Sequence, residues 1–234
     1  MMLTYEDIKK ELIEEIAKDK RANSLFNTIS SGLGTYNTAS EYAIRIGTCL
    51  GRVLRRYAPY ESIQEWDLEN LIPQALGLDH NYVAYACRQV QQVLNSDAGL
   101  GINFQEPEFD FDRAYGMVAE LREHPNFVSI ERTFYDQLVN FSQNVVDESI
   151  RRNAEVLYNS GLTSMVIRSN EFKACDWCKE VSGRYDYEEV KDKGNDVWRR
   201  HENCRCTIDF VTSRNGSSYR ERVNNQVRIS SDRR

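Results

Sequence analysis

Long apolar runs are absent from this chain of 234 residues. No stretch approaches the roughly 18 consecutive apolar residues that a membrane-spanning helix needs, so we expect no membrane span. The N-terminal sequence MMLTYEDIKKELIEE also lacks the basic n-region and the apolar h-region of a secretory signal. We therefore expect no cleaved export signal.

An excess of positive charge is also absent, because 30 Lys and Arg stand against 36 Asp and Glu, for a net charge of -6. A dedicated binder of duplex DNA is usually basic, and this balance argues against one. The charge is uneven, since residues 211–234 hold six arginines and two acidic residues. That segment carries +4, which leaves -10 on residues 1–210. A basic tail rich in Ser and Asn thus follows an acidic body.

Signatures of catalysis are missing as well. The chain has only three His residues, and it contains no H-E-x-x-H, G-x-S-x-G, G-x-G-x-x-G or phosphate-binding loop. His80 and His124 lie far in sequence from the third, His201. We therefore expect that the protein is not an enzyme, and a metal-dependent hydrolase is the weakest alternative.

The first two thirds of the chain do carry a helical pattern. Thr4-x-x-Asp7 is a possible capping box for a helix with an apolar stripe, and Thr38-x-x-Glu41 repeats that signal before a second one. Asp79 is a possible cap for a third helix. These signals predict a helical body.

Two further helices are expected before the texture of the sequence changes. Asp110 or Asp112 begins one that runs to about Glu123, and a long helix covers about 126–160. Gly161 then stands where the end of a helix favours a left-handed residue.

Short segments with a β pattern follow Gly161, at 165–169, 184–190 and 206–211. The expected fold class is α+β and mostly α. We predict a helical body at 1–161, a small zinc-ribbon-like α/β module at 162–212 and a flexible Arg-rich tail at 213–234.

The densest chemical signal is a cluster of cysteines. Four of the six Cys fall within 32 residues, as Cys175-x-x-Cys178 and, after 22 residues, His201-x-x-Cys204-x-Cys206. Two close-spaced pairs can complete a tetrahedral site, and thiolates with an imidazole favour zinc. The sequence predicts a closed structural Zn²⁺ site in which four of these five residues are ligands. Two disulfides, or four reduced thiols in a small core, are the alternatives.

Nucleic-acid binding is the main rival function. Arg199 and Arg200 adjoin His201, and the tail adds further arginines that could contact phosphates without sequence specificity. The candidate contacts are Arg199, Arg200, Arg214, Arg220, Arg222 and Arg228. A solvated turn and a disordered tail explain the same residues without a ligand.

The stretch at 149–210 resembles the C-terminal region of tailed-phage minor head proteins, the head-morphogenesis family that includes the F protein of phage Mu, especially the form in phages of Gram-positive bacteria. The matching features are a long helix that ends in N-A-E, a Gly-Leu break, C-x-x-C, G-x-Y-x-Y, G-N-D-V and R-R-H-x-N-C-x-C. They cover roughly a quarter of the chain.

The resemblance implies a structural role without a catalytic residue. Such proteins join the procapsid during assembly in the host cytoplasm and remain in the virion, inside the capsid at the portal vertex. They associate with the portal protein and are linked to DNA packaging or ejection. The resemblance implies the portal as the partner of the helical body, the major capsid or scaffolding protein as other candidates, and packaged DNA as a partner of the tail. It also implies that the five Cys and His residues form the family's metal motif, and that no fused toxin or enzyme domain follows.

Overall fold

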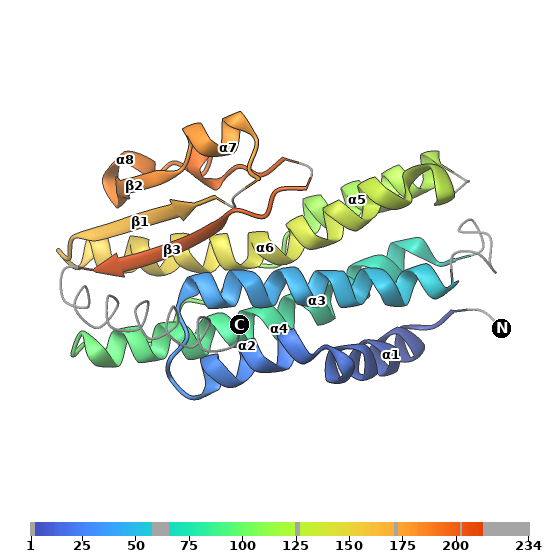
Figure 1. Ribbon diagram of the computed structural model, residues 1–234, viewed down its shortest axis with the longest axis horizontal. Helices are drawn as coiled ribbons and strands as arrows, with labels where there is room; N and C mark the ends of the chain where they lie inside the picture. The colour runs from blue at the N-terminus through green and yellow to red at the C-terminus, as the bar shows by residue number, and fades with distance from the viewer. Residues whose placement is uncertain (1–2, 58–65, 125–126, 171–172, 202, 213–234) are drawn as a thin grey trace.

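The computed structural model describes residues 3–57, 66–124, 127–170, 173–201 and 203–212. Long helices lie side by side along its longest axis, and a small sheet lies over one end of them (Figure 1). The main helices are α1 Tyr5–Lys18, α2 Lys20–Ser30, α3 Tyr36–Tyr57, α4 Leu68–Asp97, α5 Phe111–Glu123 and α6 Phe127–Asn159. The fold is α+β and mostly α, as the sequence predicts.

Helix α3 lies at the centre of the bundle and packs against α1, α2, α4 and α6. Its approach to α6 is closest at Gly47, where an added Cβ atom would lie 2.4 Å from Ser142 Oγ and 2.9 Å from Val139 Cα. The absence of a side chain at Gly47 therefore lets the backbones of α3 and α6 meet.

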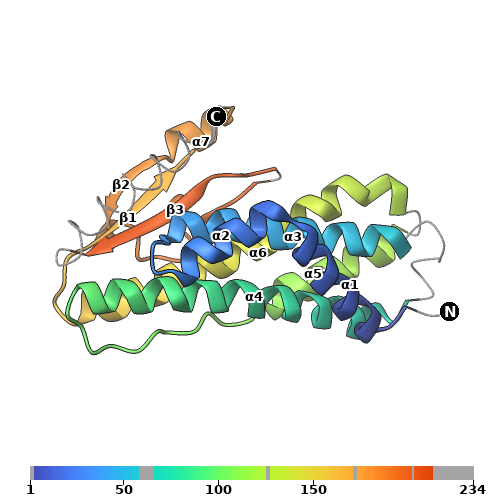
Figure 2. The same cartoon turned by 60° about the horizontal axis from the view of Figure 1, so that its bottom comes forward.

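The C-terminal part contains β1 Ser164–Ser169, α7 Asp176–Glu180, β2 Gly183–Asp186, α8 Tyr187–Val190, the 3₁₀ turn η2 Asp196–Trp198 and β3 Thr207–Thr212. The strands form an antiparallel sheet in the order β2-β1-β3. Val166 of β1 pairs with Phe210 of β3 and Tyr185 of β2. Figures 1 and 2 both show β3 along α3 and α6, and residues of β3 contact both helices.

One hydrophobic cluster extends through both sides of Gly161. Val166, Ile208 and Phe210 belong to the same buried cluster as the residues of α3, α4 and α6. Tyr36 of α3 meets Phe210 edge to edge, with ring centroids 6.3 Å apart. Gly161 marks a change of secondary structure, and the core continues across it.

Several predicted helix signals are confirmed. Thr4 and Asp7 form the capping box of α1, and Asp110 caps α5 by accepting a hydrogen bond from the N–H of Arg113. Gly161 has a φ of 79°, as a helix end favours.

Other predicted boundaries are wrong. Helix α3 begins at Tyr36, and the reciprocal pair at its start is Thr35 with Thr38. Helix α4 begins at Leu68, so Asp79 lies inside it and is fully buried. The sequence signals above do not include α2, whose start is capped by Asp19.

The predicted strand at 184–190 is half correct. Strand β2 ends at Asp186, where the side chain of Asp186 and the carboxylate of Glu189 form a capping box for α8. Local capping thus ends the strand that the alternation pattern extends to Val190. The tail at 213–234 lies outside the described residues.

None of the described helices is both long and apolar enough to cross a membrane.

Candidate metal centre

The five residues of the predicted motif converge at one end of the sheet. Cys175 caps α7, and its Sγ accepts a hydrogen bond from the N–H of Cys178, 3.4 Å away. The other three precede β3 on a turn in which the N–H of Cys204 donates to the carbonyl of His201. Asn203 completes this turn with a φ of 59°, a left-handed conformation that Asn adopts more readily than most residues. Both sequence motifs are therefore tight turns.

The ligand atoms form two triads that share Cys178. Cys175, Cys178 and His201 make one, Cys178, Cys204 and Cys206 make the other, and the atoms within each triad lie within 4.8 Å of one another. The Nε2 of His201 lies 3.3 Å from Cys175 Sγ and 3.0 Å from Cys178 Sγ. Cys178 Sγ lies 3.9 Å from Cys204 Sγ.

These separations fit a metal ion. Bonds of about 2.0–2.3 Å to tetrahedral ligands place neighbouring ligand atoms about 3.3–3.8 Å apart. The measured distances between 3.0 and 3.9 Å are close to that range. The Cys and His cluster could therefore hold a metal ion, with Cys178 as the residue common to both triads.

The centre is largely enclosed. Cys178, Cys204 and Cys206 are buried and pack with Ala174 and Trp177, whereas Cys175 is exposed. The ring of Trp177 meets the ring of His201 edge to edge, with centroids 5.7 Å apart. Such enclosure is typical of a structural metal site.

Helix α6 holds the turn of His201 and Cys206 in place. Asn140 Nδ2 donates to the carbonyl of His201 at 3.0 Å, and Gln143 Nε2 donates to the carbonyl of Cys206 at 3.1 Å. Asp147 accepts two hydrogen bonds from Arg200, at 2.6 and 2.8 Å. Three side chains of one helix face thus orient the ligand-bearing turn.

Two buried arginines flank the Cys204 sulfur. Arg200 Nη1 and Arg168 Nη2 each lie 3.8 Å from Cys204 Sγ. The hydrogen bond from the Cys206 thiol and the cations of Arg200 and Arg168 lower the pKa of Cys204, against the opposing effect of burial. The same hydrogen bond raises the pKa of Cys206. The surroundings therefore favour a thiolate at Cys204.

The arginines predicted to contact nucleic acid fall into three groups. Arg200 has a side chain only 3% exposed and is paired with Asp147, so its guanidinium is not available to a phosphate. Arg199 is exposed and forms an ion pair with Asp196 at 2.9 Å. The tail residues Arg214, Arg220, Arg222 and Arg228 lie outside the described residues.

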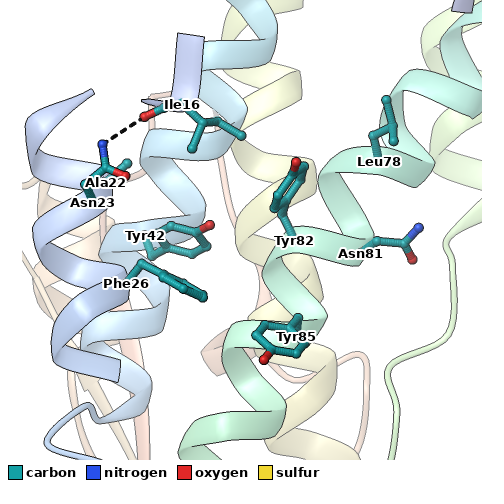
Figure 3. A pocket seen from close by; sticks show the side chains of 9 residues that line it. All are labelled: Ile16, Ala22, Asn23, Phe26, Tyr42, Leu78, Asn81, Tyr82 and Tyr85. Atoms are coloured by element: carbon teal, nitrogen blue, oxygen red, sulfur yellow. Dashed lines mark hydrogen bonds between the residues drawn. The ribbon is translucent and has the colours of Figure 1, made fainter. Parts of the chain in front are cut away.

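An apolar pocket of about 540 Å³ lies away from the Cys and His motif, between the α1–α2 junction, α3 and α4. Figure 3 shows Tyr42 and Phe26 on one side and Tyr82 and Tyr85 on the other. Asn23 donates to the carbonyl of Ile16 at its edge. None of the candidate metal or nucleic-acid residues lines this pocket.

The sequence motifs found the ligands but missed Arg168, Asn140, Gln143 and Asp147. Arg168 ends the apolar strand MVIR, and its inward direction follows the alternation Ser164, Val166, Arg168 along β1; that alternation is the one signal that could have indicated it. Comparison of the chain with protein-family models, curated proteins and solved structures found no match in any of the three.

Proposed function

We propose that this chain is a zinc-stabilised minor head protein of a tailed phage, a structural component at the portal vertex. The observation that carries the proposal is the convergence of the residues of the resemblance. C-x-x-C and H-x-N-C-x-C, 22 residues apart, meet in one cluster that is anchored to the longest helix, α6. A convergence of this kind is what a shared metal motif requires.

Zinc is the metal that these ligands favour. Four or five candidate donors are soft thiolates and an imidazole, and their separations fit a tetrahedral ion. Bound zinc would supply folding free energy by crosslinking α7 to the turn before β3. In this proposal the ion has a structural role, and the protein performs no reaction.

The helical body is the proposed docking surface for the portal protein. Residues 1–210 carry a charge of -10, which suits a protein partner better than DNA. The bundle is rigidified by ion pairs between elements, such as Arg52 of α3 with Glu15 of α1 at 3.3 Å. A stiff acidic bundle is a suitable platform for docking to a ring of subunits.

The decisive experiment is co-sedimentation of the full chain with the portal oligomer from the same genome, with and without a zinc chelator. We expect stable binding, and one zinc per chain in protein purified under reducing conditions. Cys175→Ser/Cys178→Ser is the metal-free variant, and Cys49→Ala, at a buried cysteine outside the cluster, is its matched control.

Absence of portal binding under both conditions would contradict the head-protein role. Salt-sensitive binding of the full chain to DNA, lost on deletion of 213–234, would then favour the rival function of a zinc-stabilised nucleic-acid-binding protein. Zinc content near zero would contradict the metal separately from either role.

A further inference from the structure

Arg168 is a buried cation whose charge no described carboxylate balances. Its residue is 2% exposed, and its Nη1 donates to the carbonyls of Asp196, Val197 and Arg199 at 3.1, 2.6 and 2.8 Å. Its guanidinium also lies over the ring of Trp177, 5.1 Å from the centroid. Carbonyls and a ring satisfy hydrogen bonds and dispersion, but they leave a net charge of +1 in the interior. A buried charge is costly unless a counter-charge accompanies it.

Arg200 provides the comparison within the same site. It lies at the same distance from Cys204 Sγ, 3.8 Å, but its charge is cancelled by the buried carboxylate of Asp147. Arg168 also lies 3.8 Å from that sulfur, through Nη2. Of the two cations at Cys204, Arg168 is therefore the one that keeps its charge for the sulfur cluster.

We propose that Arg168 is the counter-charge of the metal–thiolate centre, acting through Cys204. The inference rests on the zinc centre of the proposed function. A divalent ion with three thiolates and one imidazole has a net charge of -1, which one guanidinium balances, whereas four thiolates leave -2. The charge of Arg168 thus matches a centre that includes His201. Hydrogen bonds to the ligating atoms commonly change metal affinity by about 10- to 100-fold.

The test compares Arg168→Gln, which keeps donors but loses the charge, with Arg168→Lys, which keeps the charge. We measure the zinc dissociation constant of the full chain by competition with a chromogenic chelator. The expected results are a rise of at least about tenfold for Arg168→Gln and a clearly smaller rise for Arg168→Lys. Equal effects of the two variants would show that the geometry of the guanidinium, and not its charge, matters.

A second readout separates charge from folding. In iron-substituted protein the positive charge favours the reduced, more negative centre, so Arg168→Gln is expected to lower the reduction potential. An unchanged potential would overturn the inference. If Arg168→Gln does not fold even with excess zinc, folding and zinc binding by Arg168→Lys would support it, and failure of both variants would overturn it.

Two acidic residues near the centre in sequence, Glu171 and Glu202, lie outside the described residues and serve as controls. Glu171→Gln and Glu202→Gln are expected to leave zinc affinity within about twofold of wild type. If either raises the dissociation constant as Arg168→Gln does, that carboxylate balances Arg168 and the inference is wrong. A wild-type chain without zinc refutes the metal centre itself, whereas a zinc-binding chain unaffected by Arg168→Gln refutes this inference alone.

Discussion

Cys178 is the residue on which metal binding depends most, because it belongs to both ligand triads. Cys178→Ser is expected to reduce the zinc content from about one per chain to near zero, since either triad then retains only two ligands. The measurement is elemental analysis of protein purified under reducing conditions. Cys87→Ala is the matched control, because Cys87 is equally buried but lies in α4, outside the cluster. Full zinc content after Cys178→Ser would exclude both triads as the metal site.

A buried carboxyl group makes a different prediction about pH. Burial raises the pKa of Asp79 from 3.8 to about 8, although Ser142 Oγ donates a hydrogen bond to it at 2.8 Å. Between these values the folded state holds a proton that the unfolded state has lost, so this group's contribution to stability is complete below pH 4 and declines as pH rises to about 8.

Asp79→Asn removes that proton and should flatten the decline. Relative to wild type, its free energy of unfolding should improve by about 1–3 kcal/mol between pH 5 and pH 8. Urea unfolding at the two values measures the difference. Asp112→Asn, at an exposed residue of α5, is the control and should show no such trend. An equal pH dependence in Asp79→Asn and wild type would show that Asp79 is ionised in the folded protein.

The ligands of the candidate centre could be predicted from sequence, whereas their supporting residues could not. C-x-x-C and H-x-x-C-x-C are local patterns, and each becomes a tight turn. Arg200 has the sequence appearance of a solvated basic residue, but its partner Asp147 lies 53 residues away on α6. Only the packing of the turn on α6 decides that Arg200 is a buried structural cation and not a phosphate ligand.

At the scale of elements, the contact between α3 and α6 depends on Gly47. Its replacement by Ala would place a Cβ atom 2.4 Å from Ser142 Oγ and 3.0 Å from the carbonyl oxygen of Leu138, so the two helices must separate. Gly47→Ala is expected to destabilise the protein by about 1–3 kcal/mol, despite the better helix propensity of Ala.

Gly77→Ala is the matched control for that substitution. Gly77 lies inside α4, and an added Cβ atom there has no neighbour within 4 Å. The gain in helix propensity is then unopposed, and we expect a stabilisation of about 0.5–1 kcal/mol. Thermal and urea unfolding of both variants test the pair. A stabilising Gly47→Ala would mean that α3 and α6 are not packed this closely.

Helices were predictable where a local signal marks their ends. The Thr4 and Asp7 box and the Asp110 cap are interactions between residues three apart, so the sequence contains them whole. The start of α4 was not predictable from Asp79, because a residue that often caps helices is here a buried interior residue bonded to Ser142 of α6. Tertiary packing overrides the local preference of Asp in that case.

At the scale of the whole molecule, the continuous core links the metal centre to the helical body. Val166, Ile208 and Phe210 connect the sheet to the buried cluster of the helices. The pair Asp147–Arg200 fastens the ligand-bearing turn to α6, with both side chains at most 4% exposed. Loss of the metal should therefore weaken the entire fold, and not only the segment that contains the ligands.

This coupling predicts one cooperative unfolding transition, with and without zinc. A metal at a thousand times its dissociation constant stabilises the folded state by about 4 kcal/mol, so a chelator should lower the melting temperature of the whole chain. Far-UV circular dichroism reports the helices, and the fluorescence of Trp177 and Trp198 reports the region of the centre. Trp66→Phe removes the third tryptophan, which lies in the helical body and is 6% exposed. Coincident transitions in this variant, both shifted by the chelator, are the expected result. If fluorescence changes well below the temperature at which the helices melt, the sheet unfolds independently, and residues 162–212 form a separate domain despite the shared core.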